Sequence, residues 1–249
     1  RIETSVSQLE TYYQNSFEYF LNYGLHLKKR FENELDVIQA GNYYHETFDY
    51  LVKRIKEKKL NFADLTEEKL GELLIEVREE LKEEGRYRQL LNDPFNKYLF
   101  HKLDQTTGNV AHYWHSNVNK TTFRPQYSEL SFGKNQKVSG LSYSWKDDNN
   151  KKKIVDLRGK MDRVDLAQVN DRVVGEVIDY KSSAKKFDLG LFANGISMQM
   201  ISYLEVLKNN NKFFAQGKDL DVLGAFYQNI TSSLERLSSE KMILSNYQI

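Results

Sequence analysis

The chain has 249 residues, of which 40% are hydrophobic and 29% charged, a composition typical of a globular protein and not of a disordered one. Its 36 basic and 35 acidic side chains nearly cancel, so bulk charge indicates no nucleic-acid partner, and any basic surface has to be local. Because the chain contains no cysteine, disulfides, cysteine nucleophiles, zinc–thiolate sites and cysteine-ligated iron–sulfur clusters are excluded.

The sequence also bears on location. No run of about 18 apolar residues occurs, so we expect no transmembrane helix and no membrane partner. The lack of cysteine fits a reducing compartment, and we expect a cytoplasmic protein. The chain opens at Arg1 without a methionine or a signal-like region, which favours a piece excised from something longer.

Apolar side chains at helical spacing predict two helices at the start of the chain. The first spans residues 5 to about 30 and is interrupted or ended near Gly24. The second spans about 38–59 and carries His45. A lone helical histidine is more often a packed or surface residue, although imidazole is also the commonest nitrogen ligand for metals. The stripe of the first helix, which we expect to pack in the core, comprises Leu9, Tyr13, Phe17, Phe20 and Leu21.

Residues 61–120 are expected to be mostly helical. Thr66 is a possible N-cap, and Pro94 suits the first position of another helix. The charged run between them is typical of a solvated face. Three histidines in this region form no convincing ligand set: His101, His112 and His115. His112 and His115 are three residues apart, but no carboxylate lies near them in sequence.

After Arg124 the pattern changes to the alternation of β-strands. Four consecutive strands favour an antiparallel meander, and Asn170-Asp171 suits a type I′ turn between the last two. The predicted strands cover residues 127–133, 138–145, 154–169 and 172–181. Downstream we expect a helix at about 195–207, one or two strands within 213–215 and 222–227, and a polar helix at 232–249.

The third predicted strand contains a defect in its alternation. Its apolar positions are odd-numbered up to Met161 and even-numbered from Val164. A pattern of period two cannot change faces without a bulge or a bend, and bulges often redirect a side chain next to a site. The change falls beside Asp162, although a simple strand break explains it equally well at this stage.

The two arms of the predicted hairpin carry a candidate site. Asp162 lies on the first arm, whereas Asp179 and Lys181 lie on the second and point to the same face. Two carboxylates favour Mg²⁺ or Mn²⁺ over zinc, and the carbonyl of Tyr180 is a further possible ligand. Lys181 can help to activate a water or stabilise charge during phosphodiester hydrolysis. An Asp-x-Lys on a strand is common by chance, so the preceding aspartate is what gives the pattern weight.

The next predicted helix adds two polar side chains. Gln199 and Tyr203 are four residues apart and therefore share one helical face. Both can hydrogen-bond to a phosphate or a water.

These segments together resemble a known family. Three of them look like the successive motifs of RecB-type nucleases in the PD-(D/E)xK superfamily. They are the motif that runs from Gly159 through Asp162 to Asp165, the strand end at 177–183 and the Gln199/Tyr203 pair. Residues 9–25 look like the segment that opens the nuclease domain of bacterial AddB/RexB subunits, and Gly41-x-x-x-His45 is similar to the family's histidine motif.

The resemblance implies an α/β (α+β) fold with a restriction-endonuclease-like core, in which helices flank a mixed sheet. It implies one nuclease domain over 1–249, made of four parts. These are N-terminal helices with the histidine motif (1–59), a helical insertion (60–122), the catalytic sheet and helix core (123–230) and a helical tail (231–249).

The resemblance also assigns roles to matching positions. His45, Asp162, Asp179 and the Tyr180 carbonyl are expected to bind the metal, and Lys181 is the expected catalytic lysine. Gln199 and Tyr203 are expected to support the site. The predicted DNA-binding residues are Gln199, Tyr203, Ser182, Ser183 and Arg163.

One departure from the family concerns the opening motif. Many AddB proteins carry an iron–sulfur cluster and a Cys-Pro-Phe there, whereas this chain has Asn15-Ser16-Phe17 and no cysteine. No cysteine-bound cluster can form in this chain, which suggests a cluster-free, RexB-like branch. We therefore expect the aromatic stripe to tie the first helix to the rest by packing.

The leading hypothesis is a Mg²⁺-dependent DNA exonuclease domain from the B subunit of an ATP-dependent helicase–nuclease, acting on single-stranded DNA in double-strand break repair and recombination. Because no phosphate-binding Gly-x-x-x-x-Gly-Lys-Ser/Thr loop is present, the motor is expected in the rest of the protein or in an AddA/RexA-like helicase subunit. The alternatives are a non-catalytic DNA-binding or scaffold module on the same fold, or a stand-alone RecB-like nuclease.

Overall fold

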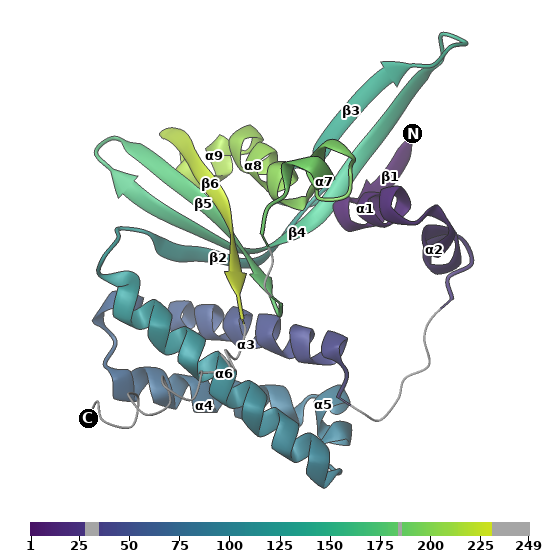
Figure 1. The fold of residues 1–249 in the computed structure, drawn as a ribbon. Helices are drawn as coiled ribbons and strands as arrows, with labels where there is room; N and C mark the ends of the chain where they lie inside the picture. Colours follow the sequence, from purple (N-terminus) through teal and green to yellow (C-terminus); the bar gives the residue numbers. More distant parts are fainter. Residues whose placement is uncertain (28–34, 184–185, 231–249) are drawn as a thin grey trace, which may run out of the picture.

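The computed structural model describes residues 1–27, 35–183 and 186–230. Within these residues a six-stranded mixed sheet separates two groups of helices (Figure 1). Parallel pairs join β1 to β4 and β5 to β6, and the remaining pairs are antiparallel. The strands are β1 (Ile2–Ser5), β2 (Arg124–Phe132), β3 (Leu141–Lys146), β4 (Lys152–Val169), β5 (Arg172–Lys181) and β6 (Asp219–Asn229).

Strand β4 is the centre of the sheet. Its first part pairs with β1 on one side and with β3 on the other, and its second part pairs with β2 and β5. The predicted hairpin between β4 and β5 is confirmed, but its turn is not of type I′, because only Asn170, at φ 52°, has the positive φ that this turn needs at both of its central residues. The predicted meander is wrong for β2, because β2 pairs with β4 and not with the strand that follows it. The 18-residue length of β4 gives it room for both partners.

One face of the sheet is covered by a helical layer, which lies below it in Figure 1. Its helices are α3 (Val37–Glu57), α4 (Glu67–Glu83), α5 (Gly85–Leu90) and α6 (Pro94–Val118), with a short 3₁₀ helix at Phe62–Asp64. Thr66 caps α4 and Pro94 opens α6, as predicted. Phe48, Trp114 and Ile178 meet in the core cluster that joins this layer to the sheet.

The opposite face is covered by α7 (Leu189–Ala193), α8 (Gln199–Asn209) and α9 (Asn211–Ala215). The predicted helix from 195 begins four residues later than expected, because Gly195 has φ 74°, outside helical geometry. The strand expected at 213–215 is instead the short helix α9, which buries Phe214. Met161, Val164 and Val177 contribute to the core cluster on this face.

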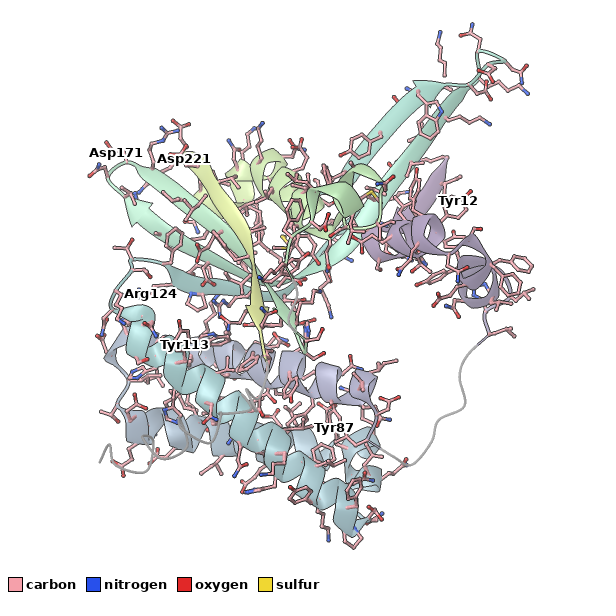
Figure 2. All side chains as sticks on the ribbon, in the orientation of Figure 1. Tyr12, Tyr87, Tyr113, Arg124, Asp171 and Asp221 are labelled. Carbon is pink, nitrogen blue, oxygen red and sulfur yellow. The ribbon has the colours of Figure 1, made fainter. Side chains whose placement is uncertain are left out.

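The start of the chain differs most from expectation. It forms β1, then α1 (Val6–Gln14), α2 (Ser16–Tyr19) and a π-helix (Phe20–Gly24). The aromatic stripe does not pack in the core, since Tyr13, Phe17 and Phe20 are 59%, 67% and 51% exposed. Tyr12 likewise lies on the outer side of α1 (Figure 2).

Other contacts attach α1 to the protein. β1 pairs in parallel with β4, and Val6 is buried in the core cluster. Glu10 on α1 accepts hydrogen bonds from the backbone N–H groups of Met198 and Gln199, at 2.6 and 2.8 Å. Because α8 has no side-chain cap of its own, this carboxylate takes over the capping role at its positive end.

The parts of the predicted N-terminal helix at 28–30, of the basic loop at 184–185 and of the tail at 231–249 lie outside the described residues. None of the helices in the described part of the chain is long and apolar enough to cross a membrane.

Candidate functional site

The site forms where β4 loses its partners on both sides. Toward β2, Ser128 pairs with Arg163 and Leu130 with Met161, but the pairing skips the intervening Asp162. Toward β5, the ladder ends at Arg163 and Ile178. The backbone N–H of Tyr180 donates to the carboxylate of Asp162 at 2.8 Å, and this carboxylate takes the place of a strand carbonyl as the acceptor. Asp162 is thus held at a break in the sheet and is free to face a ligand.

The break accounts for the change of faces in β4. Met161 and Val164 belong to the same core cluster although their positions differ in parity, so the predicted switch beside Asp162 is real. β4 keeps its register with β2 across this point, so a bend and not an inserted residue causes it. Gly159 is required nearby, because a Cβ there would lie 2.6 Å from the ring of Phe132.

Three ligand atoms converge beside this bend. Nδ1 of His45 on α3 lies 3.4 Å from Asp162 Oδ2 and 3.6 Å from Glu129 Oε1 on β2. The three groups each offer one ligand atom, and these atoms lie within 4.8 Å of one another. The structure thus brings His45 to Asp162 as predicted, from more than a hundred residues away.

Glu129 was not predicted as a site residue. It lies opposite the bend with φ 47°, a left-handed conformation that costs a non-glycine residue about 1–2 kcal/mol. Such strain persists where the surroundings impose it, often at functional sites. A sequence signal was present, because the apolar positions of β2 also change parity between Tyr127 and Leu130, on either side of Glu129.

Asp179 is the most buried member of the site, with 0% of its surface exposed. Its Oδ2 lies 2.6 Å from Nζ of Lys181, whereas Oδ1 has no hydrogen-bond partner among the described residues. Burial and the nearby Asp162 raise the pKa of Asp179 to about 6, although Lys181 opposes the shift. A buried carboxylate oxygen without a partner is costly and is typical of a group that binds a cation.

A chain of hydrogen bonds fixes Lys181. Its Nζ donates to Oε1 of Gln199 at 3.2 Å, and Nε2 of Gln199 donates to the hydroxyl of Tyr203 at 2.6 Å. That hydroxyl donates in turn to the carbonyl of Lys160 at 2.7 Å. The predicted pair on α8 therefore meets the lysine on β5. Tyr203 is 2% exposed, and its hydroxyl bonds hold Gln199 in place beside the lysine.

Two basic side chains, His45 and Lys160, lie against the carboxylates of this group. Burial lowers the pKa of His45, but hydrogen bonds to Asp162 and Glu129 outweigh it and raise that pKa to about 10. Lys160 forms an ion pair with Glu129. Because only a neutral imidazole binds a metal, a proton held by His45 would be released when an ion binds.

A hollow of about 510 Å³ opens in front of these groups. His45, Asp162 and Gln199 line it, together with Ser182 at the end of β5. Ser183 is exposed next to it. Tyr203 lines the hollow as well. The predicted contacts of Ser182, Gln199 and Tyr203 with a ligand remain predictions that this placement allows.

The predicted DNA contact of Arg163 is corrected by its position. Its side chain turns away from the hollow into the helical layer, where it lies over the ring of Trp114 at 4.2 Å. Its Nε is 2.8 Å from Oδ1 of Asp165, and both side chains are under 10% exposed. A hydrogen bond of 3.3 Å joins it to the hydroxyl of Tyr180. Arg163 therefore supports the backbone beside the site from behind.

Behind the sheet, Glu176 is the cross-strand neighbour of Asp165. Burial and the charge of Asp165 raise the pKa of Glu176 to about 7. Because this pKa is raised, the stability linked to it is present below about pH 4.5, the ordinary value, and is lost as the pH rises through about 7.

We expect Glu176→Gln to be more stable than the parent at pH 8 and equal to it at pH 4. Urea unfolding at the two pH values measures the difference, and an equal gain at both would contradict the assignment.

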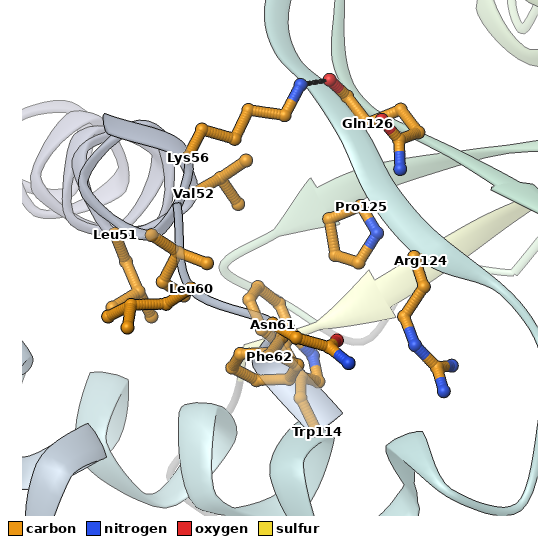
Figure 3. A pocket seen from close by; sticks show the side chains of 11 residues that line it. Leu51, Val52, Lys56, Leu60, Asn61, Phe62, Trp114, Arg124, Pro125 and Gln126 are labelled. Atoms are coloured by element: carbon orange, nitrogen blue, oxygen red, sulfur yellow. Dashed lines mark hydrogen bonds between the residues drawn. The ribbon is translucent and has the colours of Figure 1, made fainter. Parts of the chain in front are cut away.

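A second, more apolar pocket of about 260 Å³ lies between α3, α6 and β2. Leu51, Phe62, Trp114 and Pro125 line it, with Lys56 and Arg124 at its edge (Figure 3). Among the described residues, no acidic side chain and no histidine lines it, so it lacks the groups for metal or acid–base chemistry.

The donor set fits a divalent cation. A histidine nitrogen and carboxylate oxygens from β2 and β4 lie close together, and the buried carboxylate of Asp179 on β5 has an unsatisfied oxygen. Oxygen-rich sites of this kind suit Mg²⁺ or Mn²⁺. A mixed sheet with this set, and with a lysine two residues after the last aspartate on the same face, defines a metal-dependent PD-(D/E)XK nuclease site.

Comparison with known proteins agrees with this class. The profile described as the PD-(D/E)XK nuclease superfamily matches residues 3–246, and the chain belongs to that superfamily. It is 99% identical over 249 residues to the B subunit of the ATP-dependent helicase/deoxyribonuclease of Lactobacillus johnsonii, and 93% identical to that of Lactobacillus gasseri. Each alignment covers 100% of this chain and 22% of the relative.

A more distant relative has the same description. The B subunit of the ATP-dependent helicase/deoxyribonuclease of Latilactobacillus sakei is 32% identical over 248 residues, covering 97% of this chain and 21% of the relative. The chain thus spans about a fifth of the length of the curated relatives it matches. The family and the fold class predicted from the motifs are confirmed.

Proposed function

We propose that the chain hydrolyses phosphodiester bonds in DNA with Mg²⁺, or with Mn²⁺ in its place. His45, Asp162, Asp179 and the carbonyl of Tyr180 would hold the ion, and Glu129 joins them. The bound ion would neutralise phosphate oxygens and lower the pKa of a coordinated water. The observation that carries this proposal is the buried Asp179, whose one oxygen pairs with Lys181 while the other is left without a partner among the described residues.

Lys181 has the direct chemical role in this scheme. Asp179 and Gln199 hold its ammonium group from two sides, so its orientation is fixed before a substrate binds. A cation fixed in this way can donate to the attacking water or to the phosphate oxygens, where negative charge develops in the transition state. Gln199 and Tyr203 would position this lysine, and Ser182 and Ser183 would meet the strand beside it.

The relatives' names support a wider role. We propose that the chain is the exonuclease module in the B subunit of an ATP-dependent helicase–nuclease, acting on single-stranded DNA in double-strand break repair and recombination. An AddA/RexA-like helicase subunit would be its partner. Residues 60–122 would be a helical elaboration of the single domain. The complete set of site residues argues against a non-catalytic scaffold. The relatives are subunits about five times as long as this chain, which argues against a stand-alone nuclease.

Metal binding tests the site without relying on turnover. We expect Mn²⁺ to bind the chain in a titration followed by electron paramagnetic resonance. Asp162→Asn and Glu129→Gln should each weaken binding at least about tenfold, in the range known for metal-site substitutions. Glu57→Gln, on the same helix as His45 but with 67% of its side chain exposed, is the matched control and should bind normally.

The two variants separate two errors. Unchanged affinity in Asp162→Asn would overturn the metal site as a whole. Unchanged affinity in Glu129→Gln alone would remove Glu129 from the ligand set and leave the other ligands in place.

A further inference from the structure

A two-stranded arm projects from the sheet, made of β3 and the first part of β4 (residues 141–157). In Figure 1 it extends beyond the helices on both faces. Leu141 and Leu157 pair across its base and are buried in the core. Beyond Leu141, every residue of β3 is exposed. The arm therefore gains little from burial along most of its length, and its side chains are available for a ligand.

One face of the arm carries two aromatic rings. Tyr143 and Trp145 alternate with serines, so both point to the same face. They are 51% and 52% exposed. Residues two apart on a strand are separated by about 7 Å, which is about twice the 3.4 Å rise of stacked bases. The two rings are thus spaced to hold one base between them or to stack with two neighbouring bases.

The tip of the arm is basic. Four exposed lysines occur within eight residues, against two aspartates: Lys146, Lys151, Lys152 and Lys153, with Asp147 and Asp148. In a chain of net charge +1, this is a local concentration of positive charge. Lys146 and Lys152 are direct cross-strand partners, and like charges in that position are destabilising. An anionic ligand would remove that repulsion.

The turn itself is well organised. Oδ1 of Asp147 accepts the backbone N–H groups of Asn149 and Lys151, at 3.1 and 2.8 Å. Backbone hydrogen bonds join Asp147 to Lys151 and to Asn150. Lys153 lies 3.3 Å from Asp147 Oδ2, whereas no ion pair is formed by Lys146, Lys151 or Lys152 within the described chain. Asp147 thus shapes the turn and leaves most of the positive charge unpaired.

We infer that this arm is a second binding surface for single-stranded DNA, separate from the nuclease site. Aromatic rings that stack on unpaired bases, beside lysines that meet phosphates, are the combination by which proteins bind single strands without sequence preference. The identity of the nucleic acid as DNA rests on the proposed function. A protein partner suits this surface less well, because lysine is depleted in protein interfaces.

The arm is connected to the nuclease site through β4. Ten residues of strand separate Lys152 from Asp162, a span of at most about 34 Å. DNA held by the arm would therefore be tethered near the site while its end is cut. The contacts of the arm and those of the nuclease site would then both contribute to the affinity for one DNA strand.

Intrinsic fluorescence gives a direct test. The chain has 2 tryptophans, of which Trp114 is buried and Trp145 exposed. We expect oligothymidylate, added to the chain in EDTA so that no cleavage occurs, to quench the emission of Trp145. Trp145→Ala should abolish the quenching and weaken binding about tenfold by fluorescence anisotropy, whereas Trp145→Phe should retain most of the affinity.

Salt dependence tests the lysines. A triple variant of the three lysines without an ion pair, Lys146→Gln with Lys151→Gln and Lys152→Gln, should reduce the slope of log affinity against log salt by about 2, since each phosphate contact on a single strand contributes about 0.7. The matched controls lie on α6 or just beyond its end, away from the arm. They are Tyr113→Ala, which removes a ring that is 62% exposed, and a triple replacement of Lys97, Lys102 and Lys120 by glutamine.

The results separate this inference from the nuclease assignment. The inference would be overturned if oligothymidylate leaves the emission of the parent chain unchanged and Trp145→Ala binds with wild-type affinity. That result would favour an arm covered by the rest of a longer protein. Equal loss in the arm variants and the controls would overturn it as well. Asp179→Asn is expected to lose cleavage while it keeps the quenching of Trp145, so failure of the nuclease site has a different signature.

Discussion

Lys181→Met is expected to lower the cleavage of single-stranded DNA by about 10²–10³-fold, the range found when one fixed donor to a transition-state charge is removed. Methionine keeps the unbranched apolar part of the side chain but cannot donate a hydrogen bond to Gln199 or carry charge. The loss should therefore fall on the rate constant measured in single-turnover experiments, with a smaller effect on DNA affinity. Such a result would assign Lys181 to the chemical step.

The same change leaves Asp179 buried without its cation, so stability has to be measured alongside activity. The double variant Asp179→Asn/Lys181→Met removes both charges and should unfold at a higher urea concentration than Lys181→Met alone. Lys208→Met, an exposed lysine at the other end of α8, is the matched control and should cleave normally. A Lys181→Met protein that is folded and cleaves within about threefold of the parent would contradict the catalytic role.

The parts of the site that lie on a short stretch of chain could be predicted from the sequence. Asp162, Asp179 and Lys181 occur on one hairpin whose turn residues, Asn170 and Asp171, fix its register. Gln199 follows on the next long helix. Alternation along a strand and periodicity along a helix are sufficient to place these side chains on facing surfaces.

Other parts depend on pairing between distant segments. The place of β2 beside β4 and of β1 at the base of the arm follows from the length of β4, which no local pattern reveals. Glu129 enters the site only because its strand, β2, lies beside β4 and because its own backbone is left-handed. The defects at Glu129 and Asp162, taken together, would have indicated that two strands bend at the same place.

The N-terminal helix illustrates a different limit. The spacing of apolar residues identifies the stripe on α1 and α2, but it does not show whether the core or another surface covers that stripe. Tyr13 and Phe17 are exposed in this chain, which spans about a fifth of its relatives' length. The start of α8 is held to α1 by a single polar residue, Glu10. A capping contact between residues almost two hundred positions apart has no signature in local sequence.

Arg163→Met is expected to lower the free energy of unfolding by about 3–5 kcal/mol, the range for removing one partner of a buried ion pair. Asp165 would then be left 5% exposed with no opposite charge beside it. Trp114 and Tyr180 would lose the guanidinium that lies against them. Because Asp162 accepts the N–H of Tyr180, loosening this packing should also weaken metal binding, although Arg163 does not line the hollow.

Arg172 provides an internal control, since it pairs with Asp221 at 2.7 Å on the same sheet, with side chains 55% and 46% exposed. Arg172→Met should cost less than about 1 kcal/mol, as exposed pairs do. The double variant Arg163→Met/Asp165→Leu should recover most of the loss, because no charge is then left buried. Urea unfolding measures all three. If Arg163→Met costs no more than Arg172→Met, the arginine is not what holds the back of the site, and the position of Asp162 must depend on the bend in β4 alone.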